Sequence, residues 1–364
     1  MRLGVEAALI GGELVPGDVE LANGEIAAYG LSGANGHGCI AIPGFVDLQV
    51  NGFGGVDFMG ADADGYARGG EALLETGVTA YLPTFISAPE DDLLTALANV
   101  PLDPPGPRLL GVHLEGPFLS EKRLGIHSRA ARRDPDPALL ERLLGAGPVR
   151  LMTLAPELPG ADELIGLLLA RGIAVSCGHS DATAEEATRA FDRGAKTVTH
   201  LFNAMRPFAH RDPGLAGAAL AREDVIVQII LDGVHLAEET ARLIWRSAAG
   251  RVALVTDAIA GAGMGDGAYL LAGSEIEVRD GVVRGLDDVL AGSALTMIEA
   301  MRNLHRLGVP LPEALDAATS VPARVLGLPT VGRLDVGFPA DLVVLDDNLE
   351  IDRVCIGGEA RVVA

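Results

Sequence analysis

The sequence predicts an α/β protein, namely a (β/α)8 TIM-like barrel with a small β-sandwich domain formed by both termini. Three observations predict this fold. The middle of the chain alternates apolar, strand-like segments with helix-like segments, which is typical of a parallel sheet. Eight such apolar segments are present, the number that closes a barrel. Both ends instead carry short alternating segments with turn signals, as antiparallel strands do.

The two ends are predicted to form one domain. Residues 1–40 contain short alternating segments, and Asn23-Gly24 is a hairpin signal between two of them. From about Val331 the pattern is similar, with strand-like residues at 341–345 and 354–358. We therefore assign residues 1–40 and 331–364 to the small β-sandwich domain. Residues 41–330 are assigned to the barrel.

The barrel strands follow from the apolar segments in order. They are expected near residues 45–51, 78–84, 109–115, 149–155, 173–179, 197–202, 225–232 and 252–257. Helices are expected between most of them, for example at 161–171, 183–193 and 237–249. Catalytic side chains of such barrels lie at the carboxyl ends of the strands, so polar residues there are the candidates for a site.

Composition and charge restrict the class of protein. The formal net charge of −22 argues against nucleic acid or an anionic membrane as a partner. No apolar run approaches the ~20 residues of a membrane helix. The first residues lack the basic start and apolar stretch of a signal peptide, and the three scattered cysteines suit a reducing compartment. These features predict a cytoplasmic protein.

Glu115 is the first candidate site residue. It ends the apolar segment 109–115 and is followed by Gly116-Pro117, which stops the strand. Its carboxylate is therefore expected at the barrel mouth, although a capping or salt-bridged Glu is the alternative for this residue alone. His113, one step deeper on the same strand face, is expected to be a supporting or packing residue.

His179 and His200 end two consecutive predicted strands. One Glu and two His side chains are a common catalytic metal set, because three protein ligands leave an open position for water. For each His alone, a buried hydrogen-bonded imidazole is the alternative. The three residues together predict a metal site.

Asp257 ends the eighth predicted strand. A barrel hydrolase needs a base that takes a proton from water and returns it to the leaving amine, and a carboxylate beside the metal suits that cycle. The alternative is an N-cap of a following helix. Residues 258–263 are too rich in Gly for a strong helix start.

These units, in this order, resemble the amidohydrolase superfamily, and within it the N-acetylglucosamine-6-phosphate deacetylase family. The resemblance spans essentially the whole chain. It rests on Pro43-Gly44-Phe45-Val46-Asp47-Leu48-Gln49-Val50-Asn51-Gly52, His113-Leu114-Glu115-Gly116-Pro117-Phe118, Gly178-His179-Ser180, Thr199-His200-Leu201-Phe202-Asn203-Ala204-Met205, Asp232-Gly233-Val234-His235, Thr256-Asp257-Ala258 and Leu290-Ala291-Gly292-Ser293-Ala294-Leu295-Thr296-Met297.

The resemblance implies metal-dependent hydrolysis of the acetamide of a phosphorylated amino sugar, N-acetylglucosamine 6-phosphate, to glucosamine 6-phosphate and acetate. It implies a set of residue roles: Zn²⁺ or another divalent ion bound by Glu115, His179 and His200; Asp257 as acid and base; His127 placing the acetamide; and Asn203, Ala204, His235 and Arg211 holding the phosphorylated sugar.

One departure from the superfamily concerns the number of metal ions. Many members carry His-x-His after the first strand, where this chain has Gln49-Val50-Asn51, and amide side chains are poor zinc ligands. Many two-metal members also use a lysine after the fourth strand, and residues 153–157 contain none. Both absences predict one metal ion per chain.

The segment from Met205 to Gly214 is predicted to be a long ordered loop, because it contains two prolines and ends in Gly. Its two arginines and a His beside Phe208 suit a polar interface with an aromatic anchor. The resemblance implies that Arg211 reaches the phosphate of the neighbouring subunit in a homodimer. The alternative is an exposed loop whose arginine serves its own barrel or nothing.

Two rival functions are considered. The chain could be another amidohydrolase, such as a cyclic-amide hydrolase, a deaminase or an N-acyl-amino-acid deacetylase. The missing His-x-His and lysine argue against most of these. It could also be a catalytically inactive relative that serves as a scaffold, but such proteins typically lose ligands, and this chain keeps Glu115, His179, His200 and Asp257.

Overall fold

Eight parallel strands form the barrel that the middle of the sequence predicts. The structure is a computed structural model that describes residues 1–32, 38–285 and 288–363. Each strand pairs in parallel with the next around the barrel. The strands are β6 (Phe45–Val50), β9 (Val78–Ile86), β11 (Val112–Glu115), β12 (Val149–Leu154), β13 (Ala174–Cys177), β14 (Thr197–Val198), β15 (Ile226–Ile229) and β16 (Val252–Leu254). A short strand, β10 (Arg108–Leu109), also pairs with β9.

The barrel closes between the ends of β16 and β6. The N–H of Asp257 donates to the carbonyl of Gln49 at 2.9 Å, and the N–H of Asn51 donates to the carbonyl of Ala258 at 2.8 Å. These bonds bring residues from the first and last barrel strands together at the mouth. The closure is therefore built from the same segments that carry candidate site residues.

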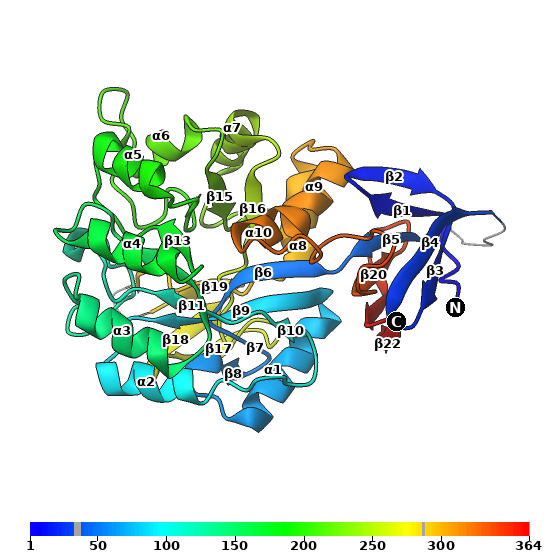
Figure 1. Cartoon of the computed structure of the whole chain (residues 1–364), viewed down its shortest axis with the longest axis horizontal. Coiled ribbons are helices and arrows are strands. Elements are labelled where there is room, and N and C mark those ends of the chain that lie inside the picture. Colours follow the sequence, from blue (N-terminus) through cyan, green and yellow to red (C-terminus); the bar gives the residue numbers. More distant parts are fainter. Residues whose placement is uncertain (33–37, 286–287, 364) are drawn as a thin grey trace.

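Helices cover the outside of the barrel (Figure 1). They are α1 (Ala63–Glu75), α2 (Glu90–Ala98), α3 (Pro137–Ala146), α4 (Ala161–Ala170), α5 (Ala184–Arg193), α6 (Gly214–Leu220), α7 (Glu238–Ala248), α8 (Met297–Arg306), α9 (Leu311–Ala318) and α10 (Ser320–Val325), with the 3₁₀ turns η1 (Phe58–Gly60) and η2 (Glu121–Arg123). The three helices expected from the sequence are confirmed within one residue at each end. For α5 the reason is local: Thr183 and Glu186 form a capping box, and Gly194 ends the helix at φ 116°.

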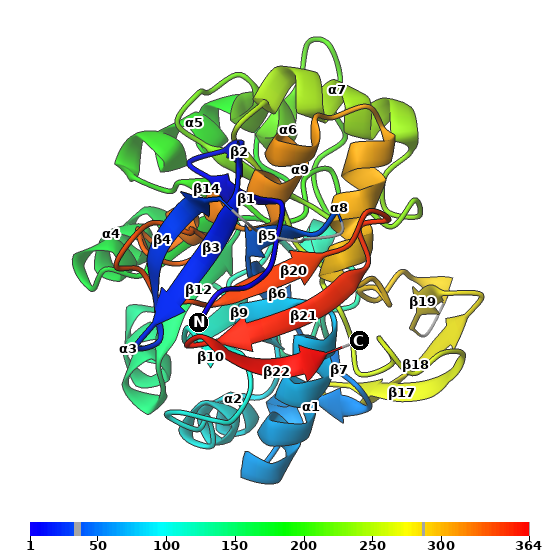
Figure 2. The same ribbon diagram turned by 90° about the vertical axis from the view of Figure 1, so that its right-hand side faces the viewer.

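Strands from both termini build a second, mixed sheet at one end of the molecule, the end that faces the viewer in Figure 2. Its order is β2 (Glu13–Pro16), β1 (Ala7–Ile10), β5 (Ile40–Pro43), β20 (Leu342–Leu345), β21 (Ile351–Ile356) and β22 (Glu359–Val363). The hairpin β3 (Asp18–Ala22) and β4 (Glu25–Leu31) turns at Asn23-Gly24, as predicted. A hydrophobic core separate from the barrel core includes Val19, Ile26 and Leu342.

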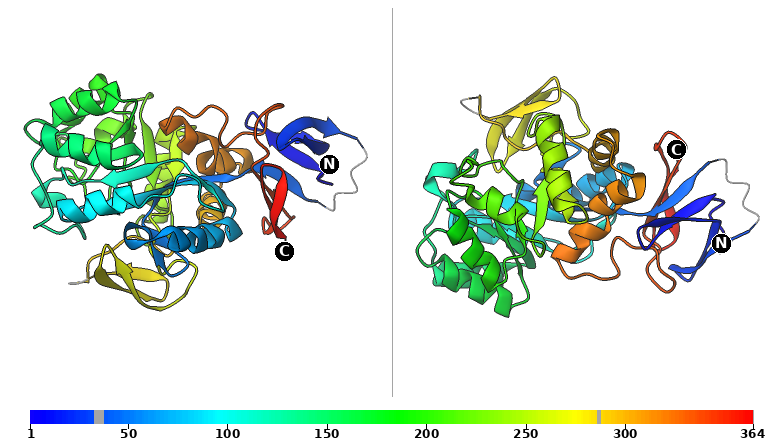
Figure 3. Two further views of the ribbon diagram at one scale, coloured as in Figure 1. Left: turned by 60° about the horizontal axis from the view of Figure 1, so that its bottom comes forward. Right: turned by 90° about the horizontal axis from the view of Figure 1, so that it is seen from above.

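A third, three-stranded sheet was not expected from the sequence. It consists of β17 (Gly267–Leu271), β18 (Ser274–Arg279) and β19 (Val282–Arg284), and it projects from one side of the barrel (Figure 3). A further small hairpin joins β7 (Gly52–Phe53) and β8 (Val56–Asp57). The three-stranded sheet has its own small core, which includes Ile259, Ile276 and Val283.

No helix among the described residues is both long and apolar enough to cross a membrane.

Candidate active site

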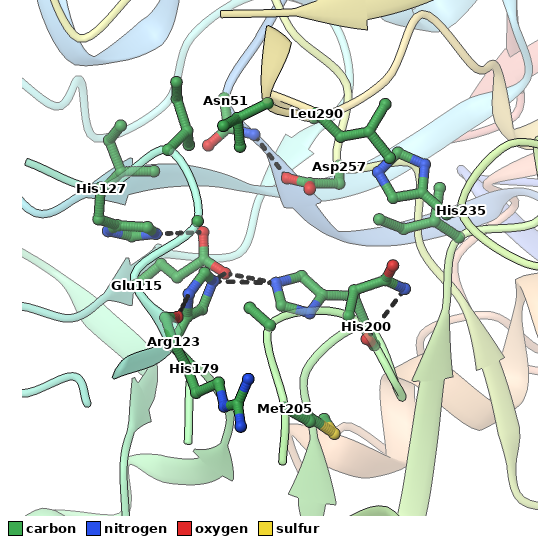
Figure 4. A pocket seen from close by; sticks show the side chains of 18 of the residues that line it. Asn51, Glu115, Arg123, His127, His179, His200, Met205, His235, Asp257 and Leu290 are labelled. Atoms are coloured by element: carbon green, nitrogen blue, oxygen red, sulfur yellow. Dashed lines mark hydrogen bonds and ion pairs between the residues drawn. The ribbon is translucent and has the colours of Figure 1, made fainter. Parts of the chain in front are cut away.

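The carboxyl ends of the barrel strands open into a cavity of about 420 Å³. Eight of the nine candidate residues line it: Glu115, His127, His179, His200, Asn203, Ala204, His235 and Asp257. Apolar side chains from the third sheet and its flanks, among them Leu271 and Leu290, form another part of the wall. The cavity wall is therefore polar around Glu115 and Asp257 and apolar where Leu290 lies (Figure 4).

Glu115, His179 and His200 converge on one point. The Nε2 atoms of His179 and His200 lie 3.1 and 3.0 Å from Oε1 of Glu115, and 3.1 Å from each other. All three side chains are buried. A tetrahedral ion with ligand bonds near 2.0 Å separates its ligand atoms by roughly 3.3 Å, so this triangle fits one divalent ion.

The backbone at the strand ends is unusual. His179, His200 and Asp257 adopt φ values of 47°, 29° and 51°, in the left-handed region that non-glycine residues rarely occupy. Such conformations carry strain and cluster at functional sites. They turn the chain sharply after each strand, and that turn lets these side chains point into the cavity.

The histidines around Glu115 stabilise its charge. Burial by itself raises the pKa of this carboxyl, but contacts with the rings of His127, His179 and His200 hold the pKa well below its ordinary value. Glu115 is consequently an ionised carboxylate in the middle of a buried site.

Asp257 is held by two amide side chains. Nδ2 of Asn51 and Nε2 of Gln49 both donate to Oδ1 of Asp257, at 2.7 and 3.1 Å. Gln49 also donates to Glu115 at 3.1 Å. Burial, and secondly the charge of Glu115, raise the pKa of Asp257 to about 6. With Oδ1 engaged, Oδ2 is the oxygen available for proton transfer.

His127 is a neutral imidazole with a defined tautomer. Burial, and secondly the neighbouring His179, lower its pKa to about 4. The backbone N–H of Ser87 donates to its Nδ1 at 3.2 Å, so the ring proton lies on Nε2. That Nε2 is 3.6 Å from Oε2 of Glu115. His127 therefore offers an N–H donor next to the triad.

His235 lies at the other side of the cavity. Its Nδ1 pairs with Asp232 at 2.7 Å, and its backbone N–H donates to the same carboxylate at 2.8 Å. The paired Nδ1 leaves Nε2 for a ligand. The amide of Asn203 points back to the carbonyls of His200 and Leu201, at 3.3 and 3.4 Å.

Arg211 is the one candidate residue that does not line this cavity. It lies in the exposed part of the loop between Met205 and α6, next to an exposed Phe208. Within the described parts of the chain, its guanidinium forms no ion pair and no hydrogen bond. The structure thus places Arg211 away from its own site.

Below the triad, hydroxyl groups span the barrel interior. His113 contacts Thr84 at 3.2 Å and Thr153 at 2.7 Å, and Thr153 contacts Thr199 at 2.7 Å. His113 is fully buried, and burial lowers its pKa to about 4. It packs beneath the ligands rather than joining them, in agreement with the sequence-based expectation.

Sequence reasoning missed four residues near the site. Gln49 and Asn51 were interpreted only as poor metal ligands, whereas they contact Asp257. Lys122 and Arg123 also line the cavity. A signal existed for Lys122, because it is one of two lysines in the sequence and closely follows the His-Leu-Glu-Gly-Pro segment.

Comparison with known proteins identifies the family. Residues 40–361 match the amidohydrolase family. The chain is 40% identical over 341 residues to N-acetylglucosamine-6-phosphate deacetylase of Bos taurus, which covers 88% of this chain and 83% of that protein. The chain belongs to the N-acetylglucosamine-6-phosphate deacetylase family.

Two further members of this deacetylase family are informative. N-acetylgalactosamine-6-phosphate deacetylase of Escherichia coli is 36% identical over 325 residues, 87% of this chain and 86% of that protein. A variant of N-acetyl-D-glucosamine-6-phosphate deacetylase from Mycobacterium smegmatis, solved in complex with N-acetyl-D-glucosamine-6-phosphate, superposes with a TM-score of 0.94. Its sequence is 38% identical, with 100% of this chain and 99% of that chain covered.

Membership in the amidohydrolase family and the buried triad together suggest a bound metal ion in this deacetylase-family chain. The donor set of one carboxylate and two imidazoles is the set found in catalytic zinc sites.

Proposed function

We propose that the chain hydrolyses the acetamide of N-acetylglucosamine 6-phosphate to glucosamine 6-phosphate and acetate. The observation that carries this proposal is the buried Glu115–His179–His200 triangle beside an Asp257 of raised pKa. Identity of 40% to a deacetylase of that name supports the substrate.

Asp257 has the properties of the acid and base in this reaction. A divalent ion held by Glu115, His179 and His200 would supply an activated water molecule and polarise the amide carbonyl. Ionised Asp257 accepts the proton of the attacking water on Oδ2 and returns it to the amine nitrogen as the C–N bond breaks. Gln49 and Asn51 hold Oδ1 throughout, so the acceptor oxygen keeps its position. Nε2–H of His127 donates to the oxygen on which negative charge develops.

We propose one ion per chain, Zn²⁺ or a similar divalent ion. The support is that the described residues contain one such triangle of ligand atoms, and that the amide side chains of Gln49 and Asn51 bond to carboxylates. Elemental analysis of the purified, dialysed chain should find about one divalent ion per chain. Two tightly bound ions per chain would contradict this proposal.

For the substrate, we propose that the phosphate lies near His235, Asn203 and Ala204. Arg211 of a second chain in a homodimer completes this phosphate-binding site. His235 offers its free Nε2 there. Arg211 lies on an exposed loop and lacks ion-pair partners within the described part of its own chain. A net charge of −22 repels anions at long range, so local donors must supply the affinity.

We also propose that residues 1–40 and 331–364 form one domain and that residues 41–330 form the other. We further propose that the protein is cytoplasmic. The core that includes Val19, Ile26 and Leu342 supports the division, whereas Leu9, Val343 and Val354 of the terminal strands pack in the barrel core. The described residues do not include 33–37 and 364 of the terminal domain or 286–287 of the barrel.

Acetate release from a panel of sugars tests the function. The panel contains N-acetylglucosamine and N-acetylgalactosamine, each with and without a 6-phosphate, and the chain is tested with and without a chelator. We expect release from N-acetylglucosamine 6-phosphate to have the highest kcat/KM and to stop with the chelator. Faster release from the galactosamine epimer, or from an unphosphorylated sugar, would reject the assigned substrate.

A further inference from the structure

The two metal-facing histidines differ in how their rings are held. Nδ1–H of His179 donates to the main-chain carbonyl of Arg123 at 2.9 Å, while Nε2 faces Glu115 and His200. A bond on the outer nitrogen of a ligand histidine fixes its tautomer and ring orientation. By contrast, Nδ1 of His200 is buried with no hydrogen-bond partner among the described residues. The orientation of His179 therefore depends on where the Arg123 carbonyl lies.

That carbonyl belongs to the short turn η2 after β11. The turn is tied to the loop after β13 by a backbone bond, from Ser120 N–H to the carbonyl of His179 at 2.9 Å. Its side chains make the second connection. Arg123 donates to Oδ1 of Asp181 through Nε at 2.9 Å and a terminal nitrogen at 2.7 Å, and Lys122 reaches Oδ2 at 3.0 Å.

Asp181 is itself firmly placed. Its backbone N–H donates to Glu157, after β12, at 2.6 Å. Arg206, on the segment after β14, approaches Oδ2 of Asp181 at 3.6 Å, and its own N–H donates to the carbonyl of Ser180 at 2.9 Å. The side chain of Asp181 is only 11% exposed. One carboxylate thus joins the segments that follow three barrel strands, β11, β13 and β14.

Ion pairs and a main-chain bond meet at Asp181. Three cations, Lys122, Arg123 and Arg206, pair with two carboxylates, Asp181 and Asp212. A third carboxylate, that of Glu157, accepts from the backbone N–H of Asp181. This geometry suits the fixing of one loop against another.

We propose that Asp181 is a positioning residue: by clamping Lys122 and Arg123, it holds the Arg123 carbonyl against Nδ1 of His179 and so orients that ring toward the metal. This inference rests on the metal site of the proposed function. It concerns metal affinity, so it can be tested without any substrate.

Asp181→Asn is the test variant, because the amide keeps the size of the side chain and loses its charge. The metal dissociation constant is measured by competition with a chelator of known affinity, using chain stripped of metal and reloaded with Zn²⁺. We expect binding about 10- to 100-fold weaker than in the original chain, the range for loss of support to a ligand histidine. Asp181→Glu, which restores the charge, should recover most of the affinity.

The matched control is Asp224→Asn. Asp224 also pairs with an arginine, Arg222, at 2.8 Å, but it is more exposed and lies on the outside of the barrel. Exposed pairs of this kind contribute little to stability. The control should bind Zn²⁺ as the original chain does. An Asp181→Asn affinity within threefold of the original would overturn the proposal.

Arg123→Gln provides a second variant if Asp181→Asn folds poorly. It keeps the carbonyl and removes the ion pair, so it should also weaken Zn²⁺ binding. Unchanged affinity in this variant would likewise count against the clamp.

Circular dichroism of the metal-free chains separates a folding defect from a loss of affinity. If the original chain binds Zn²⁺ but releases no acetate from the sugar panel, the proposed function fails while the test of the clamp stands.

Discussion

Two carboxylates at the barrel mouth, Glu115 and Asp257, have pKa values shifted in opposite directions. Contacts with three histidine rings outweigh burial at Glu115 and lower its pKa, whereas burial and the charge of Glu115 raise the pKa of Asp257 to about 6. Opposed pKa values in neighbouring groups separate their chemical roles. Here they separate an ionised carboxylate, the proposed metal ligand, from a group that can take and return a proton near neutral pH.

Replacing Asp257 with Asn tests the second role. The amide keeps the shape but cannot accept a proton, so kcat should fall by ~10²–10⁴-fold or more. Metal content and substrate binding, followed by elemental analysis and calorimetry, should remain close to those of the original chain. Turnover near the original value would assign the base to another residue.

The pH dependence of kcat/KM follows from the same group. Asp257 must be ionised to accept a proton, so activity is present above its raised pKa and is lost as the pH falls through about 6. Initial rates between pH 5 and 8, with metal content checked at each pH, measure this limb. A constant kcat/KM down to pH 5 with full metal occupancy would contradict the assignment.

At the scale of elements, the barrel strands and the three named helices could be predicted from the sequence. The spacing of apolar residues that defines these elements is a local property. Strand β14 is shorter than its predicted segment, since the backbone turns at His200 with φ 29°. The third sheet was missed although Ile276, Val278 and the turn residues Asp280-Gly281 carried a hairpin pattern. Its core depends on distant segments, which local patterns do not reveal.

The contacts within the site were harder to predict than its ligands. Glu115, His179 and His200 stand at strand ends, where the fold itself predicts convergence. The bond from Asn51 to Asp257 joins residues 206 positions apart and depends on how the barrel closes. Strand spacing alone could not show that an amide in the place of a histidine would support the carboxylate.

A substitution at Gly292 tests how tightly Asp257, which follows β16, is held in place. A Cβ on Gly292 would lie 2.6 Å from the carbonyl oxygen of Asp257, and its φ is 70°. Gly292→Ala should lose about 1–2 kcal/mol of stability from the left-handed backbone, and it should also lose kcat because Asp257 is displaced.

Gly308→Ala is the control for this prediction. Gly308 has φ 94°, but a Cβ there would have no atom within 4 Å. It should show the loss of stability from the left-handed backbone alone, with normal kcat. Equal kcat values in the two variants would show that the end of β16 can move without harm.

At the scale of the whole molecule, the exposed loop carrying Arg211 is the feature that a single chain does not explain. Phe208, in the same loop, is 54% exposed, and α7 and its preceding loop expose Leu243 and Val234. Exposed apolar side chains, together with an arginine that has no partner among the described residues, suit an interface between two copies. The proposed homodimer would bury them and bring Arg211 to the neighbouring cavity.

Mixing two inactive variants tests this arrangement. Arg211→Ala chains and Asp257→Asn chains are combined under conditions that exchange subunits. If Arg211 acts across the interface, each mixed dimer has one intact site, and about a quarter of the original activity should return. If Arg211 acts within its own chain, every site stays defective. A monomer in sedimentation experiments would reject the dimer.

The pairing of β5 with β20 sets an order for biosynthesis. These strands join Pro43 to Leu342, so about 300 residues separate the two partners. During translation, β5 is synthesised early. Its edge toward β20 stays without a hydrogen-bonding partner while the barrel segments are synthesised. The sheet at the far end of the molecule can be completed only after synthesis is nearly finished. Until then, the exposed edge of β5 is a place where a nascent chain could pair with the wrong partner.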